Sequence, residues 1–265
     1  MKGFIMLIQS IKDMMRYKDL VSYLVKGEFK AKYSGTILGY IWWILDPLFF
    51  MMIYVLLIGV ILGRGGPDYP AFLICGLVAW KFTAGCLSDC VNSISGNLRM
   101  MNQVFLPVII FPTIKCINNL INLGFGLLLV LVIISFYPIQ FSVNILYLPL
   151  IVLVQLLFNL SLGLILAHFG VFFKDIQTIM QSFVLRVWFY LSPIIYAPDL
   201  IPDKYLHLFM LNPVAPLLTS YRNVLMYGKS PDFTGLLILF LFSVLLYTLG
   251  TSLVYKNYGN YARVV

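Results

Sequence analysis

Four charged residues interrupt long apolar stretches of the sequence: Asp46, Lys81, Asp89 and Arg186. A charge in apolar surroundings is costly, so such residues either pair with one another or face an aqueous path. In one interpretation, Lys81 pairs with Asp46 and Arg186 pairs with Asp89. In the other, Lys81 and Arg186 line a path and attract phosphate, because lysine offers a compact charge and arginine a planar fork. We favour pairing for Lys81 and the path for Arg186.

No pattern typical of catalysis or metal binding accompanies these charges. Cys86 and Cys90 have the i,i+4 spacing of a helical metal pair, but no histidine is near them in sequence, so we interpret them as small buried hydrophobes. His168 and His207 are isolated. The sequence lacks the phosphate-binding pattern G-x-x-x-x-G-K-S/T, as well as H-E-x-x-H and G-x-S-x-G. We therefore expect no catalytic residue, no metal site and no cofactor bound by this chain.

The composition indicates a protein that lies in a membrane. Of its 265 residues, 61% are hydrophobic and 11% are charged, and the mean hydropathy is +0.95. An average soluble domain is about 45–50% apolar and about 25% charged, so this chain has too little polar surface for a soluble globule. The net charge of +8 fits basic residues gathered on the cytoplasmic side better than a nucleic-acid site.

The apolar runs predict an all-α, polytopic membrane protein. A spanning helix needs ~20 mostly apolar residues. Six segments meet this requirement: 37–62, 69–94, 112–136, 144–172, 176–198 and 233–255. We expect Pro107 and Pro112 to separate a short helix from the start of the third span. In the segment 199–232, the apolar runs Tyr205–Leu211 and Val214–Met226 are too short to span, which predicts two short re-entrant or interfacial helices.

The distribution of lysine and arginine predicts the orientation. These residues are concentrated in residues 1–36 and in the loops on the same side as the termini, whereas the outer segments hold only Arg64, Lys204, Arg222 and Lys229. Both termini are therefore expected to be cytoplasmic. Residues 1–36 form an amphipathic cytoplasmic segment whose first helix is expected to lie in the membrane interface, and residues 37–265 form the six-span domain.

Aromatic residues make up 16% of the chain and gather near the ends of the expected spans. Tyr40, Trp42 and Trp43 are near the cytoplasmic end of the first span, and Phe105 precedes the third. Such residues commonly form belts at the headgroup level. Alternatively, they line a path and contact the apolar faces of sugar rings.

Motifs in a particular order carry a resemblance that covers nearly the whole chain. They are Glu28-Phe-Lys-Ala-Lys-Tyr33, Leu38-Gly-Tyr-Ile-Trp-Trp43, Asp46-Pro47, Gly76-Leu-Val-Ala-Trp80, Asn97-Leu98, Phe105-Leu-Pro107, Phe172-Phe-Lys-Asp-Ile176, Leu191-Ser-Pro-Ile-Ile-Tyr196, Leu211-Asn-Pro213 and Tyr221-Arg222. With six spans, this order resembles the permease subunits of bacterial ABC exporters of lipid-linked polysaccharides, which include O antigen, capsule and wall teichoic acid.

The resemblance implies a transporter subunit of the bacterial plasma membrane rather than an enzyme. It implies a permease homodimer with two separate cytoplasmic ATP-binding subunits, which use ATP and Mg²⁺. The implied substrate is a polymer on undecaprenyl pyrophosphate, with its lipid in the bilayer and its sugars in a channel between the permeases. The residues assigned to this path are Tyr40, Trp42, Trp43, Lys81, Phe105 and Arg186.

The expected contacts with the ATP-binding subunits are Glu28, Arg99, Met100, Asn102, Lys174 and Asp175. They lie on cytoplasmic segments close to the membrane, where a mechanical signal must enter. Alternatively, Arg99 and Lys174 only fix the topology.

The sequence departs from the family pattern at Ala79, where a proline is expected, at Lys81, where an aromatic or apolar residue is expected, and at Arg186. The alternatives are an ABC permease for drugs or lipids, a secondary transporter or channel, and a membrane enzyme acting on isoprenoid carriers. A neighbouring gene with an ATP-binding motif favours the ABC alternatives, and neighbouring glycosyltransferase genes favour a polysaccharide substrate.

Overall fold

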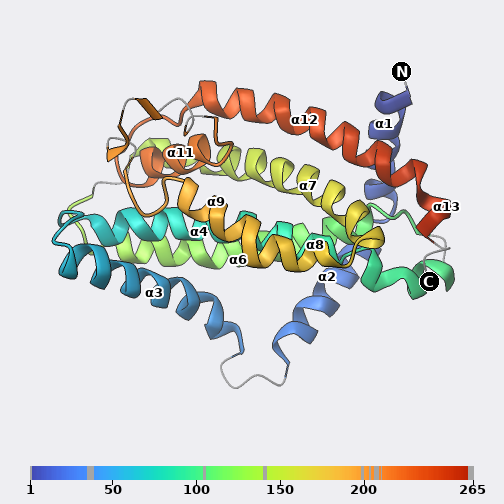
Figure 1. Ribbon diagram of the computed structural model, residues 1–265, viewed down its shortest axis with the longest axis horizontal. Helices are drawn as coiled ribbons and strands as arrows, with labels where there is room; N and C mark the ends of the chain where they lie inside the picture. Colours follow the sequence, from blue (N-terminus) through green and yellow to red (C-terminus); the bar gives the residue numbers. More distant parts are fainter. Residues whose placement is uncertain are drawn as a thin grey trace.

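The structure, a computed structural model, describes residues 2–34, 39–103, 106–139, 142–197, 200–202, 204–205, 209 and 211–261, and within them it contains helices and no strand. Long helices run alongside one another (Figure 1). The helices α1 (Lys2–Arg16) and α13 (Tyr258–Tyr261) lie at one end of this bundle, called here the terminal end. The helix α11 (Ala215–Leu225) lies at the other, called the α11 end.

Five helices of the described residues are long and apolar enough to cross a membrane. They are α3 (Trp42–Tyr54) continued by the π-helical segment η2 (Val55–Ile61), α4 (Tyr69–Val91), α6 (Ile110–Ile134), α7 (Leu148–Phe172) preceded by the 3₁₀ segment η4 (Val143–Tyr147), and α12 (Phe233–Lys256). They match five of the six predicted spans. The polytopic, all-α fold class is therefore confirmed.

The remaining predicted span, 176–198, is a shorter helix than we expected. It consists of α8 (Asp175–Ile179), the π-helical segment η5 (Met180–Val184) and α9 (Leu185–Leu191), which follow one another without a break. Ser192 is extended, with ψ of 144°, because a following proline, here Pro193, disfavours the helical conformation. At ~1.5 Å per residue, this helix is roughly 25 Å long. It still runs from the terminal end towards the α11 end (Figure 1).

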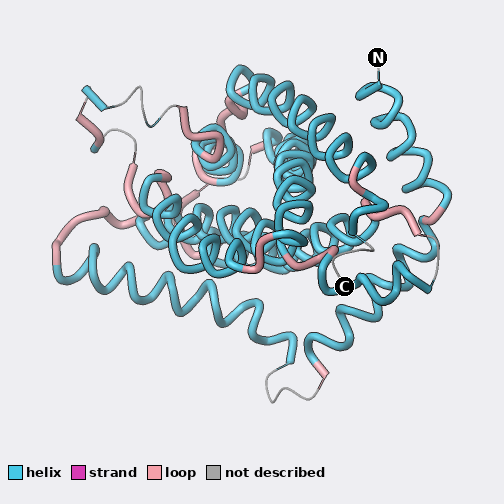
Figure 2. Tube along the Cα trace, turned by 45° about the vertical axis from the view of Figure 1, so that its right-hand side comes forward, coloured by secondary structure: helices cyan, strands magenta, loops and turns pink. Residues whose placement is uncertain are grey.

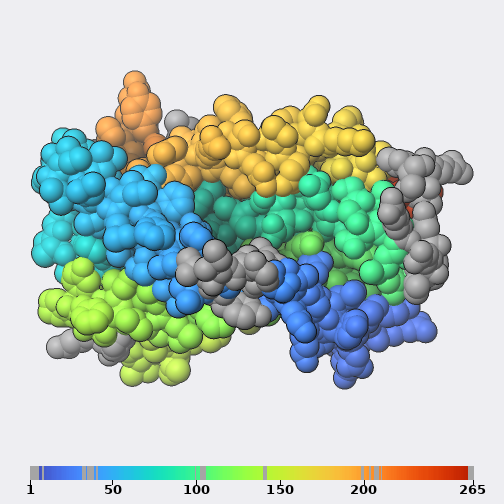
Figure 3. All heavy atoms as spheres, turned by 90° about the horizontal axis from the view of Figure 1, so that it is seen from below, coloured from blue at the N-terminus to red at the C-terminus, as the bar shows by residue number. Residues whose placement is uncertain are grey.

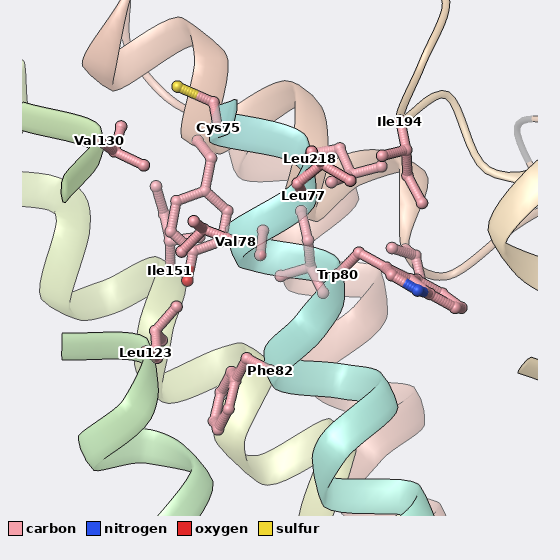
Figure 4. Close-up of a cluster of buried hydrophobic side chains, with 14 of the residues drawn as sticks. Cys75, Leu77, Val78, Trp80, Phe82, Leu123, Val130, Ile151, Ile194 and Leu218 are labelled. Carbon is pink, nitrogen blue, oxygen red and sulfur yellow. The ribbon is translucent and has the colours of Figure 1, made fainter. Parts of the chain in front are cut away.

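Helix α4 forms the centre of the bundle, and α3 lies at its edge. In the most apolar 18-residue window of α4, 72% of the residues are buried, against 6% for the helix α3–η2. Side chains from α6 and α7 pack against one side of α4, and Ile194 and Leu218 pack against the other (Figure 4). Figure 2 shows α3 along the border of the molecule. Most of the surface of α3 is thus left for lipid or a partner.

A buried polar network joins three helices of this core. The Nε2 group of Gln155 in α7 donates hydrogen bonds to the carbonyl of Ala79, at 2.8 Å, and to Oγ1 of Thr83, at 3.0 Å, both in α4. The hydroxyl of Tyr221 in α11 donates to Oε1 of Gln155, at 2.8 Å. Buried polar groups require such partners, so the network fixes α11 against the two long helices.

The predicted proline break is confirmed at Pro107 and wrong at Pro112. The 3₁₀ segment η3 (Ser95–Asn97) and α5 (Leu98–Gln103) precede Pro107, and α6 begins after it. Pro112 lies in the first turn of α6. There the backbone N–H groups have no partner within the helix, so a proline breaks no hydrogen bond.

The amphipathic N-terminal segment forms two helices that contact the bundle. The hydroxyl of Tyr255 in α12 donates to Asp13 of α1 at 2.6 Å, and the hydroxyls of Ser10 and Tyr247 lie 3.1 Å apart. Helix α2 (Lys18–Tyr33) contacts α6. Only part of the apolar face of α1 packs against the protein: Leu7 contacts the core, whereas Met15 is 71% exposed.

The segment before α12 contains one of the two expected short helices, α11, which matches the run Val214–Met226. Its buried residues show that it packs inside the protein. The run Tyr205–Leu211 lies mostly outside the described residues. We expected Arg222 among the outer-loop charges, but its side chain is only 3% exposed.

Candidate functional site

A groove of about 830 Å³ lies between α3, α4, α6 and α9. Figure 3 looks onto this side of the molecule, where α3, in blue, and the α8–α9 helix, in yellow to orange, flank the teal and green atoms of α4 and α6. Trp42, Trp43 and Phe50 from α3, with Phe189 and Tyr190 from α9, supply aromatic rings to its lining. The groove is thus an aromatic surface within the part of the protein that crosses the membrane.

The α3 wall follows helical spacing. Trp43, Asp46, Phe50 and Tyr54 recur every three or four residues, which places them on one face of the helix. Tyr54 meets the opposite wall at Phe189, where the ring centroids are 5.9 Å apart. This contact joins the two walls of the groove.

An ion pair between Lys81 and Asp46 crosses the groove from α4 to α3. The side chain of Lys81 is 29% exposed and that of Asp46 is 55% exposed. Nζ of Lys81 also lies 5.1 Å from the centroid of the Phe50 ring, within the range of a cation–π interaction. The pairing that we favoured for Lys81 is present, and it fixes α3 to the core.

Arg186 lines the same groove from α9 but, unlike Lys81, has no acidic ion-pair partner among the described residues. Its side chain is exposed, and within the described residues it makes no ion pair. The alternative pairing with Asp89 is not observed: Asp89 accepts a hydrogen bond from Nδ2 of Asn119 at 2.9 Å and lies in a different cavity. The segment η5 directly precedes α9, and π-helical turns often occur at functional sites.

The floor of the groove depends on glycines. A Cβ atom at Gly85 of α4 would collide with the side chain of Asn119, and one at Gly126 of α6 would lie 2.6 Å from Cγ1 of Val78. A larger residue at Gly126 would press against Val78 and oppose the close approach of α4 and α6, whereas at Gly85 the Asn119 side chain would have to move aside. Both glycines line the groove, so larger side chains at these positions would reduce its volume.

A second, more polar cavity of about 540 Å³ adjoins the first. Glu28 in α2 accepts hydrogen bonds from Nζ of Lys115, at 2.8 Å, and from Nδ2 of Asn118, at 3.0 Å, both in α6. Asn122 lines both cavities. The N-terminal segment thus reaches the helices of the groove floor through the Glu28 contacts.

The predicted path residues divide into two groups. Trp42, Trp43, Lys81 and Arg186 all line the groove. The side chain of Tyr40 and the whole of Phe105 lie outside the described residues. We missed Phe50 and Tyr54, although their spacing from Trp43 in the sequence indicates a shared helical face.

Of the residues predicted to contact ATP-binding subunits, the structure describes some side chains and not others. Met100 in α5 is exposed, as are Lys174 and Asp175 at the start of α8. The side chains of Arg99 and Asn102 lie outside the described residues. Glu28 is held by its contacts with α6.

The cysteines and His168 belong to the packing of the protein. Cys86, Cys90 and Cys116 are buried free thiols, and Sγ of Cys90 lies 3.7 Å from Sγ of Cys116. Nδ1 of His168 lies 2.7 Å from the hydroxyl of Tyr261, which docks α13 onto α7. Burial raises the pKa of the Tyr261 phenol, which keeps its proton available for this hydrogen bond. His207 lies outside the described residues.

Comparison with known proteins gives a consistent family assignment. Residues 19–226 match the family model of the ABC-2 type transporter. The chain is 31% identical to the O-antigen export system permease protein RfbA of Myxococcus xanthus, over 98% of this chain and 100% of that protein. It is 26% identical to the protein of that name from Klebsiella pneumoniae, over 93% and 95% of the two chains. It is 25% identical to the polysialic acid transport protein KpsM of Escherichia coli, over 89% and 92%. With its bundle of apolar helices, this chain belongs to the ABC-2 type transporter membrane family.

Proposed function

We propose that this chain is the permease subunit of an ABC exporter that moves a polysaccharide across the bacterial plasma membrane. The observation that carries the proposal is the similarity to an O-antigen export permease over 98% of this chain and the whole of that protein. The aromatic groove supports it, because flat rings offer surfaces for the apolar faces of sugars. We further propose that the polymer is bound to undecaprenyl pyrophosphate, whose lipid stays in the bilayer.

The permease functions as a homodimer in this proposal. The groove opens beside α3, whose continuation η2 exposes apolar residues such as Leu56, Val60 and Ile61. A second copy placed against this surface would bury these residues and cover the groove. The sugars would then pass between two aromatic walls, one from each copy.

Two ATP-binding chains complete the transporter. This chain carries no phosphate-binding loop of the G-x-x-x-x-G-K-S/T pattern, so ATP and Mg²⁺ are used by the partners. Their contacts are assigned to Met100, Lys174 and Asp175, together with Arg99 and Asn102 on α5 and with Glu28 on α2. In this arrangement the terminal end faces the cytoplasm. Charge reversal at Arg99 or Asp175 should then separate ATP turnover from export.

Deletion of the gene, followed by complementation, tests the function in the cell. Loss of a surface polysaccharide, with its lipid-linked precursor accumulating inside, is the expected result. Unchanged surface polysaccharide would contradict the proposal and favour a drug or lipid substrate. Purification together with a candidate ATP-binding subunit tests the assembly, because a permease that stays monomeric and binds no such protein would contradict it.

A further inference from the structure

The positive and negative side chains that line the groove do not cancel. Asp46, Lys81 and Arg186 are the charged residues among the described residues that line it. Lys81 and Asp46 neutralise each other in their ion pair. Among the described residues, Arg186 therefore leaves one positive charge without a counter-charge in a lining that is otherwise aromatic and apolar apart from Asn119 and Asn122.

The position of Arg186 makes this charge available to a ligand. Arg186, Phe189 and Tyr190 are three or four residues apart on α9, so they share one face of the helix, and all three line the groove. The guanidinium side chain is exposed rather than covered by neighbouring helices. A guanidinium group offers five N–H donors in a planar fork, which matches the two oxygens of a phosphate or carboxylate.

Resting on the proposed function, we propose that Arg186 is an oxyanion-binding residue of the transport path. It binds a phosphate or carboxylate group of the substrate while the aromatic residues contact its sugars. Lys81 does not serve this purpose, because Asp46 and Phe50 occupy its ammonium group. The oxyanion has two chemical sources, the diphosphate of the lipid carrier and acidic groups in the repeating unit of the polymer.

Binding to the purified permease with its ATP-binding partner, in nanodiscs, tests this proposal. Farnesyl diphosphate is the probe for the lipid source, with farnesol as its uncharged counterpart. A sialic acid trimer is the probe for the acidic-sugar source, with maltotriose as its neutral counterpart. Arg186→Gln removes the charge, Arg186→Lys retains it, and Val187→Ala is a control on the same helix outside the groove lining.

We expect Arg186→Gln to weaken the binding of at least one anionic probe about tenfold, which corresponds to about 1.4 kcal/mol. Its neutral counterpart should bind as before, Arg186→Lys should retain part of the affinity, and Val187→Ala should change nothing. An effect on farnesyl diphosphate alone identifies the carrier as the source, and an effect on the trimer alone identifies the polymer.

Three results would overturn the proposal. The first is wild-type protein that binds neither anionic probe more tightly than its neutral counterpart. The second is an Arg186→Gln variant with unchanged affinity for both. The third is failure of both Arg186→Gln and Arg186→Lys to assemble, which would give Arg186 a structural role. The binding assay does not depend on export in cells, so its failure is distinguishable from failure of the proposed function.

Discussion

The guanidinium carbon of Arg222 in α11 lies 3.5 Å from the centroid of the Phe72 ring in α4. The same group donates hydrogen bonds to the carbonyls of Pro193 and Ile194, at 2.6 and 2.8 Å. Both carbonyls belong to the segment that follows α9, where the backbone leaves the helix. One buried arginine therefore joins α11, α4 and the end of α9.

Arg222→Met is expected to lower the free energy of unfolding by about 2 kcal/mol or more. The substitution leaves two backbone carbonyls without their donor, and an unsatisfied buried polar group costs ~1–3 kcal/mol. Thermal unfolding in detergent measures the effect. Arg64→Met is the matched control, because Arg64 is an exposed arginine near the same end. Equal unfolding midpoints for the two variants would contradict the structural role of Arg222.

Gly170→Ala should be strongly destabilising, whereas Gly124→Ala should not. A Cβ atom at Gly170 of α7 would collide with the backbone carbonyl oxygen of Val91, which ends α4, and backbone cannot move aside as a flexible side chain can. A Cβ atom at Gly124 of α6 meets nothing within 4 Å. Alanine is favoured over glycine inside a helix by roughly 0.5–1 kcal/mol. Purification yield and unfolding temperature give the comparison, and the same loss in both variants would be inconsistent with close packing at Gly170.

The sequence predicts features that depend on local composition and fails where distant residues meet. The lengths of the apolar runs identified five spans, because the hydropathy of a span depends only on consecutive residues. The Lys81–Asp46 pair was predictable because two opposite charges in apolar runs need partners. The contact between Asp13 and Tyr255 was not, because nothing in either segment specifies the other. Arg222 was mistaken for a loop charge, since its partners are backbone carbonyls that leave no trace in the sequence.

Part of the lining of the candidate groove was also predictable, because single residues of a distinctive type can be identified in the sequence. Trp42 and Trp43 were identified by residue type, and Lys81 and Arg186 by charge in apolar surroundings. The glycine floor was not identified, because the sequence does not show which helix faces Gly85 or Gly126. The early end of α9 was also missed, although Pro193 disfavours a helical conformation at Ser192.

A double-mutant cycle at Lys81 and Asp46 should show favourable coupling. Lys81→Met leaves the carboxylate of Asp46 without its ion-pair partner, so assembly yield and thermal stability should fall. Combining it with Asp46→Leu should restore both, because the pair is then replaced by apolar groups. The coupling should be about 1 kcal/mol, since both side chains are partly exposed. Additive losses in the double variant would show that the two residues act independently.

Reversing the charge of Glu28 should reduce the coupling of ATP turnover to export. Glu28 links α2 to Lys115 and Asn118 of α6, so Glu28→Lys places two cations together and breaks the polar contact between the N-terminal segment and α6. Adding Lys115→Glu recreates an ion pair with the opposite polarity, and we expect it to restore export. Asp19→Lys is the control, because Asp19 is an exposed acid in the first turn of the same helix. Polysaccharide exported per ATP hydrolysed is the measurement for all three variants. Export by Glu28→Lys at the level of Asp19→Lys would show that the signal from the ATP-binding chains does not pass through this contact.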